Sequence, residues 1–202
     1  MFFKSALTNI VPSILSARGI DIGQLSSDEA RVFWMPEIGD LHDPYLFTGM
    51  QAAVDRIIEA RTNGERVIVF GDYDVDGVSS TAMLLRYFTS IGIAVSHRIP
   101  HRSRDGYGMK PYFFDELATK SVGLVISVDC GTRDIESIRH AKSLGIDVIV
   151  TDHHAVPAII PEEAVAIITP KLPGSIYPYT GLSGSGVAFK LLSAVAHRIT
   201  PV

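Results

Sequence analysis

The sequence predicts an α/β fold in which a parallel β-sheet is covered by helices on both faces. Apolar runs of strand length, at 67–70, 124–128 and 146–150, alternate along the chain with stretches of helical spacing. Each run is almost continuously apolar, which is typical of parallel strands buried on both faces. The chain has 202 residues, of which 47% are hydrophobic and 20% charged, enough for one or two domains with a core.

The first clear element is a helix that starts near residue 50. Residues 1–47 show no clean period, and we interpret them as an N-terminal cap that ends after the turn at Asp43-Pro44. Thr48 and Gln51 have the spacing of a capping box, and Asn63-Gly64 is a stop signal. The apolar positions of this helix are Met50, Ala53, Val54, Ile57 and Ile58.

Strand, loop and helix then alternate to the end of the chain. The expected strands are 67–70, 94–99, 124–128, 146–150 and 164–168. The expected helices are 78–91, 133–144 and 185–199. Residues 48–202 are thus expected to form the core domain.

Composition limits the function classes. The only cysteine, Cys130, excludes a disulfide framework and multi-cysteine metal sites, and we expect it to be a small buried residue. The net charge of −4 gives no global basic field for nucleic acid. No stretch approaches the roughly 18 apolar residues of a membrane span, and the N-terminus lacks a cleavage pattern, so we expect a cytoplasmic protein without membrane partners.

Acidic and histidine side chains follow three of the predicted strands, where the carboxyl ends of parallel strands meet at one edge. The loop after the first strand is expected to be extended and carries an acidic residue at every second position, Asp72, Asp74 and Asp76. Neighbouring carboxylates would then lie about 6–7 Å apart, and each pair would repel by about 2.5 kcal/mol. A helix dipole explains one such carboxylate but not three. With Asp129 and the run Asp152-His153-His154 they predict a site for two divalent cations, where imidazole favours Mn²⁺ over Mg²⁺.

Two other segments are candidates for phosphate binding. Residues 97–110 hold four basic side chains and Tyr107, which indicates either a solvated loop or a loop that grips phosphates and offers one ring for base stacking. The glycine-rich residues 181–186 open the last helix but lack the lysine of a phosphate-binding loop. Close packing of that helix is therefore the favoured role of these glycines.

Three ordered motifs, GDYDVDG, SVDCGT and TDHH, are preceded by LHDPYLFTGM and followed by GLSGSGVAFKLL. In this order they resemble the DHH phosphoesterase superfamily and, within it, the RecJ exonucleases. The resemblance implies 5′ to 3′ hydrolysis of single-stranded DNA with Mn²⁺ or Mg²⁺ in repair and recombination. It also implies that a single-strand-binding protein and a helicase are partners.

The resemblance assigns roles motif by motif. Asp74 and Asp76 would bind metal with support from Asp72, and Asp129 would bridge the two ions. His153 would bind the second ion and His154 would contact the scissile phosphate. Among the remaining side chains, the expected supporting residue is Asp152 and the expected substrate-binding residues are Arg102 and Tyr107.

Two departures and two alternatives remain open. Phe70 stands where many superfamily members carry a histidine. The chain also ends before a fourth motif and a second domain of the RecJ exonucleases, so we expect it to fold but to bind metal weakly and to cleave poorly. The alternatives are a phosphoesterase for pyrophosphate, cyclic dinucleotides or short oligonucleotides, and a noncatalytic scaffold of the same fold.

Overall fold

The computed structural model describes residues 2–199, and within them all side chains except those of residues 2–9 and 22. The chain forms two compact units, Met1–His42 and Asp43–Val202. The sequence analysis placed this boundary slightly later, with a cap at 1–47 and a core at 48–202. The first residue of the expected cap and the last three of the expected core lie outside the described residues.

The first unit is helical. It contains α1 (Phe2–Ala17), α2 (Ser27–Trp34) and two short 3-10 helices at Ile22–Gln24 and Ile38–Asp40. The start of α2 is fixed by a capping box in which Ser26 Oγ accepts from the backbone N–H of Glu29, and the Glu29 carboxylate accepts from that of Ser26. These helices were not predicted, because apolar residues do not recur in these segments at a sustained helical spacing.

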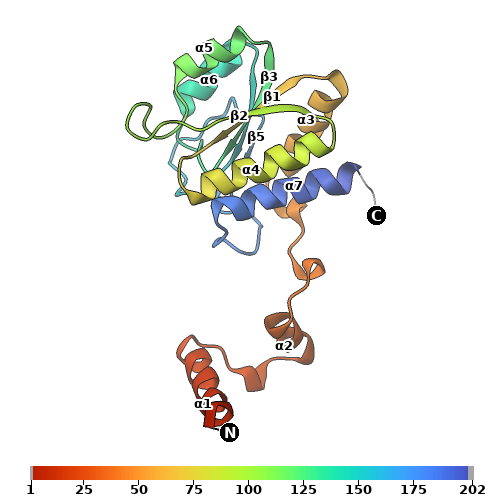
Figure 1. Cartoon of the computed structure of the whole chain (residues 1–202), viewed down its shortest axis with the longest axis vertical. Helices are drawn as coiled ribbons and strands as arrows, with labels where there is room; N and C mark the ends of the chain where they lie inside the picture. Colours follow the sequence, from red (N-terminus) through yellow and green to blue (C-terminus); the bar gives the residue numbers. More distant parts are fainter. Residues whose placement is uncertain (1, 200–202) are drawn as a thin grey trace. The chain divides into compact units, whose positions relative to one another are not determined.

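The second unit is built on a five-stranded parallel sheet, as predicted (Figure 1). The strands are β1 (Arg66–Gly71), β2 (Ala94–Arg98), β3 (Val122–Val128), β4 (Asp147–Thr151) and β5 (Ala166–Ile168). Their order in the sheet is β2-β1-β3-β4-β5. From β1 the chain therefore runs to β2 at one edge of the sheet, crosses back to β3 on the other side of β1, and continues through β4 to β5 at the other edge.

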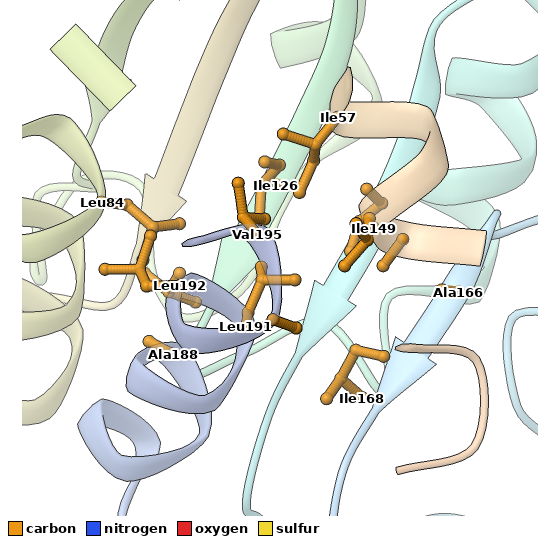
Figure 2. Packing of buried hydrophobic residues seen from close by; sticks show 14 of the residues in the cluster. Ile57, Leu84, Ile126, Ile149, Ala166, Ile168, Ala188, Leu191, Leu192 and Val195 are labelled. Carbon is orange, nitrogen blue, oxygen red and sulfur yellow. The ribbon is translucent and has the colours of Figure 1, made fainter. Parts of the chain in front are cut away.

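Helices cover both faces of this sheet, which confirms the predicted fold class. One face packs against α3 (Met50–Asn63), α4 (Val75–Ser90) and α7 (Gly184–Ile199). The other packs against α5 (Pro111–Ala118) and α6 (Ile135–Ser143). Figure 2 shows apolar side chains of α7 lying between α4 and the sheet, so α7 is held on both sides.

Three local predictions were wrong. No capping box forms at Thr48 and Gln51: the N-cap of α3 is Gly49, with φ of 82° and no side-chain cap. The loop after β1 is not extended, because α4 begins at Val75, three residues earlier than expected. The helix α5 was not predicted. It has Pro111 in its first turn, a favourable position for proline, and buries Phe113, Phe114 and Leu117.

Within the part of the chain that the structure describes, no helix combines the length and the apolar character that a membrane span requires.

Candidate metal centre

The acidic and histidine motifs meet at the carboxyl edge of the sheet. β1 lies between β2 and β3, and the connections after β1 and β3 depart in opposite directions. Such a switch point leaves a crevice in which parallel α/β sheets bind ligands. The motif residues follow β1, β3 and β4, which are neighbours in the sheet, so the topology gathers all three motifs around this crevice.

The first motif forms a tight turn between β1 and α4. Asp74 is the N-cap of α4, and its Oδ1 accepts a hydrogen bond from the Gly77 N–H at 3.0 Å. Asp72 is buried and accepts from the Tyr73 N–H, and burial raises the pKa of its carboxyl. A Cβ on residue 77 would lie 2.4 Å from the carbonyl oxygen of Asp72, so this turn requires glycine at Gly77.

Asp129 is the central residue of the site. It follows β3 in a left-handed backbone conformation (φ 63°) and is fully buried. Among the described residues no group donates a hydrogen bond to either of its carboxylate oxygens. Burial, followed by the negative charges of Asp74 and Asp76, raises the pKa of Asp129 to about 8. A buried carboxylate without donors is the environment that a bound cation would satisfy.

Two groups of possible ligands share this residue. In one, ligand atoms of Asp72, Asp74 and Asp129 lie within 4.8 Å of one another, and in the other those of Asp129, His153 and His154 do so. Carboxylate and imidazole ligands suit Mn²⁺ and, less well, Mg²⁺. The side chains therefore fit divalent ions, and Asp129 is common to both groups.

The orientation of His153 fits a metal ligand. Its Nδ1 lies 3.1 Å from the carbonyl oxygen of Leu182 and donates to it, because a carbonyl can only accept. Nε2 is then the unprotonated nitrogen, and it lies 3.2 Å from Asp129 Oδ1. Histidines that bind metals commonly donate their other ring N–H to such a carbonyl.

Asp152 is buried and fixes the DHH turn. Its Oδ1 accepts from the N–H groups of His153 and His154 and from His154 Nδ1 at 2.8 Å. Its Oδ2 accepts from both the N–H and the hydroxyl of Thr132. Burial favours a higher pKa, but these hydrogen bonds outweigh burial and hold the pKa of Asp152 below its ordinary value. Asp152 is thus a buried anion that orients His154.

The N-terminus of α7 reaches the same site, which the sequence analysis did not foresee. The Ser185 hydroxyl donates to Asp76 Oδ1 at 2.7 Å, and the Ser185 N–H donates to the same oxygen. Burial acts to raise the pKa of Asp76, but hydrogen bonds from Ser185, Ser183 and Gly184 bring it below its ordinary value. The only sequence signal was the run of small residues at 181–186, whose favoured role was close packing.

The basic loop contributes two of the predicted substrate residues. Tyr107 donates from its hydroxyl to the carbonyl oxygen of Asp129 at 3.3 Å, and its ring lies edge-on to His154. The guanidinium of Arg102 lies over the ring of Tyr73, 5.0 Å from its centroid, next to the first motif. Arg98 and Arg104 instead pair with acidic side chains of α5 and of the loop itself, Glu116 and Asp105.

The structure thus brings together Asp72, Asp74, Asp129, His153, His154 and Tyr107. Asp76 lies beside them, but its Oδ1 is engaged by Ser185 and it belongs to neither ligand group. Phe70 offers no ligand: its ring is buried, 5.0 Å from that of Phe113. Cys130 is fully buried, as expected. The roles of the individual side chains stay predictions.

The chain is similar to several known proteins. The model of the DHH family, N-terminal domain, matches residues 66–201. The single-stranded-DNA-specific exonuclease RecJ of Bacillus subtilis is 39% identical over 94% of this chain. RecJ of Escherichia coli is 40% identical over 73% of the chain.

A solved structure has the same fold. The crystal structure of an exonuclease RecJ bound to manganese superposes with a TM-score of 0.70 at 35% identity, covering 76% of this chain and 38% of that one. The chain spans about a quarter of the two curated relatives, 23% of the Bacillus protein and 26% of the Escherichia protein.

Proposed function

Since this chain belongs to the DHH family, we propose that it carries the metal centre of an exonuclease that hydrolyses single-stranded DNA from the 5′ end. The observation that carries the proposal is Asp129, a buried carboxylate that receives no hydrogen bond from the described residues and is shared by two groups of possible ligands. The RecJ relatives, named as specific for single-stranded DNA, support the choice of substrate.

The two ligand groups would hold two divalent ions, Mn²⁺ or Mg²⁺. Asp72 and Asp74 would bind the first and His153 the second, with Asp129 between them; Asp76 is a further candidate ligand for the first. When bound, such a pair polarises the phosphate and lowers the pKa of the attacking water. The manganese in the similar RecJ crystal structure supports this cofactor.

The protein side chains supply the positioning. His154 donates Nδ1–H to the buried anion Asp152, so its Nε2 is the nitrogen left to face the scissile phosphate, to which it would donate when protonated. Tyr107 borders the same histidine and can stack on a base, while Arg102 can contact a phosphate from the side of the first motif. Water attacks phosphorus, and the bond to the 3′ oxygen of the leaving nucleotide breaks.

The wider assignments are part of the same proposal. From the RecJ resemblance, the protein would act in the cytoplasm in DNA repair and recombination. Its partners would be a single-strand-binding protein and a helicase. Residues 48–202 would form the phosphoesterase core, and residues 1–47 a separate N-terminal segment.

The test is Mn²⁺-dependent release of mononucleotides from a 5′-labelled single-stranded oligonucleotide. We expect release from the single strand, little from the matching duplex, and none from an Asp129→Ala variant. Asp55→Ala is the matched control, because this carboxylate is exposed on α3 and hydrogen-bonds Gln51.

Two results would contradict the proposal. Cleavage of a dinucleotide or of pyrophosphate at rates far above those on the long strand would assign a small substrate. A Mn²⁺ titration without heat, together with strand binding that is indifferent to Asp129→Ala, would indicate a noncatalytic scaffold.

A further inference from the structure

A cleft with room for about 450 Å³ lies beside the metal centre. Its size is within the range of pockets that hold small ligands. It runs from the DHH turn to the loop between β3 and α6. Its lining residues are Tyr107, Gly131, Thr132, Arg133, Asp152, His154 and Ala155.

Arg133 is the cation of this cleft, and its backbone is fixed on both sides. Before it, the N–H and hydroxyl of Thr132 both donate to Asp152 Oδ2, at 3.2 and 2.7 Å. After it, Asp134 donates its N–H to the Gly131 carbonyl, and its carboxylate accepts from the Met109 N–H at 2.8 Å. The Asp152 carboxylate, which orients His154 through Oδ1, therefore also fixes through Oδ2 the place from which Arg133 projects.

The side chain of Arg133, in contrast, has no ionic partner. It is exposed, and no acidic side chain among residues 2–199 forms an ion pair with it. On the adjoining helix, Arg139 pairs with Glu163 at 2.7 Å. A guanidinium without a protein partner is well suited to bind an anion, because it has no ion pair to give up and its N–H groups match the geometry of phosphate oxygens.

We infer that Arg133 binds a backbone phosphate of the substrate strand, next to the phosphate that is hydrolysed. The inference rests on the proposed function, which places the scissile phosphate at His154. The cleft extends from His154 to Arg133, so the nucleotide that follows along the strand would lie in it. An arginine can donate hydrogen bonds to two phosphate oxygens at once, which would also set the direction of the strand.

The test compares two substrates that differ in the neighbouring phosphate. A thymine oligonucleotide has a phosphate on each side of the cleaved bond, whereas the p-nitrophenyl ester of thymidine 5′-monophosphate has only the scissile one. For Arg133→Ala we expect kcat/KM on the oligonucleotide to fall about tenfold more than on the ester, mainly through KM. Removing one phosphate contact should also lower the slope of log KM for the oligonucleotide, plotted against the logarithm of the salt concentration, by about 0.7.

Arg139→Ala is the matched control, because it removes an exposed arginine from the same region without touching the cleft. Its ratio of the two kcat/KM values should equal that of the unchanged chain. Mn²⁺ affinity, measured by calorimetry, should be the same in both variants, which would separate a lost phosphate contact from a disturbed metal centre.

Three outcomes would overturn the inference. Arg133→Ala could behave like Arg139→Ala, or it could slow both substrates equally, which would place Arg133 at the scissile phosphate. It could also weaken Mn²⁺ binding, which would make its role structural. If the unchanged chain hydrolyses neither substrate, the proposed function itself fails and the inference falls with it.

Discussion

Gly184, the first residue of α7, lies directly against the side chain of Asp129. A Cβ on residue 184 would lie 2.1 Å from Asp129 Oδ1 and 2.9 Å from Asp129 Cβ. Because the Cβ atom of Asp129 is also this close, rotating the carboxylate of Asp129 cannot relieve the clash with a side chain at residue 184. The last helix of the chain therefore depends on a glycine to approach the centre of the metal site.

Gly184→Ala should displace Asp129 and weaken Mn²⁺ binding at least tenfold, as measured by calorimetry. Overpacking should also lower the free energy of unfolding by about 1–3 kcal/mol. Gly186→Ala is the control, because its Cβ would lie 3.3 Å from the flexible end of Leu182. Equal Mn²⁺ affinity in the two variants would contradict the close contact at Gly184.

The stability of the metal-free chain should fall as the pH rises from about 4 to about 8. Folded, Asp129 keeps its proton up to a pKa of about 8, whereas unfolded it titrates near its ordinary value of 3.8. Between these values the folded chain binds more protons, so the free energy of unfolding decreases with pH, by up to about 1.4 kcal/mol per pH unit for one such group.

Urea unfolding in EDTA across this pH range measures the effect. Asp129→Asn cannot titrate and should flatten the slope, whereas Asp55→Asn, an exposed carboxylate on α3, should keep it. The same slope in Asp129→Asn as in the unchanged chain would mean that the folded chain does not hold this proton.

Tyr107→Phe should lower kcat on single-stranded DNA about three- to tenfold and change KM less. The hydroxyl of Tyr107 donates to the Asp129 carbonyl and lies 3.4 Å from His154 Nδ1, and one such hydrogen bond is worth about 1 kcal/mol. Tyr112→Phe, on the exposed side of α5, should change neither constant. A change confined to KM would assign Tyr107 to strand binding alone.

Arg56→Ala should destabilise the fold by about 2–4 kcal/mol without affecting the chemistry. At the amino edge of the sheet Arg56 joins Glu65 and Asp147, at 2.6 and 2.7 Å, and its removal leaves two carboxylates facing each other. Arg66→Ala, which removes an exposed side chain, should cost little in comparison. Chemical denaturation measures both, and a loss of Mn²⁺ affinity in Arg56→Ala would contradict this division of roles.

Much of the fold could be predicted because burial leaves a local pattern. The runs ending at Phe70, Val128 and Val150 are apolar on both faces, and this pattern belongs to parallel strands. The start of α4 was misplaced because Asp74 was interpreted as a loop ligand, although it also caps the helix. The helix α5 was missed because it is short and its apolar residues do not repeat.

The sheet, the helices on both faces and the chemistry at the strand ends follow from the amino-acid sequence, since the order of strands and motifs brings Asp74, Asp129 and His153 to one edge. The surroundings of these three residues depend on how distant elements pack. Helix α7 packs across the sheet so that Gly184 and Ser185 meet Asp129 and Asp76, which are distant in sequence. Local periodicity sets which face of a helix is buried, but the point at which its end meets another loop depends on packing against the whole core.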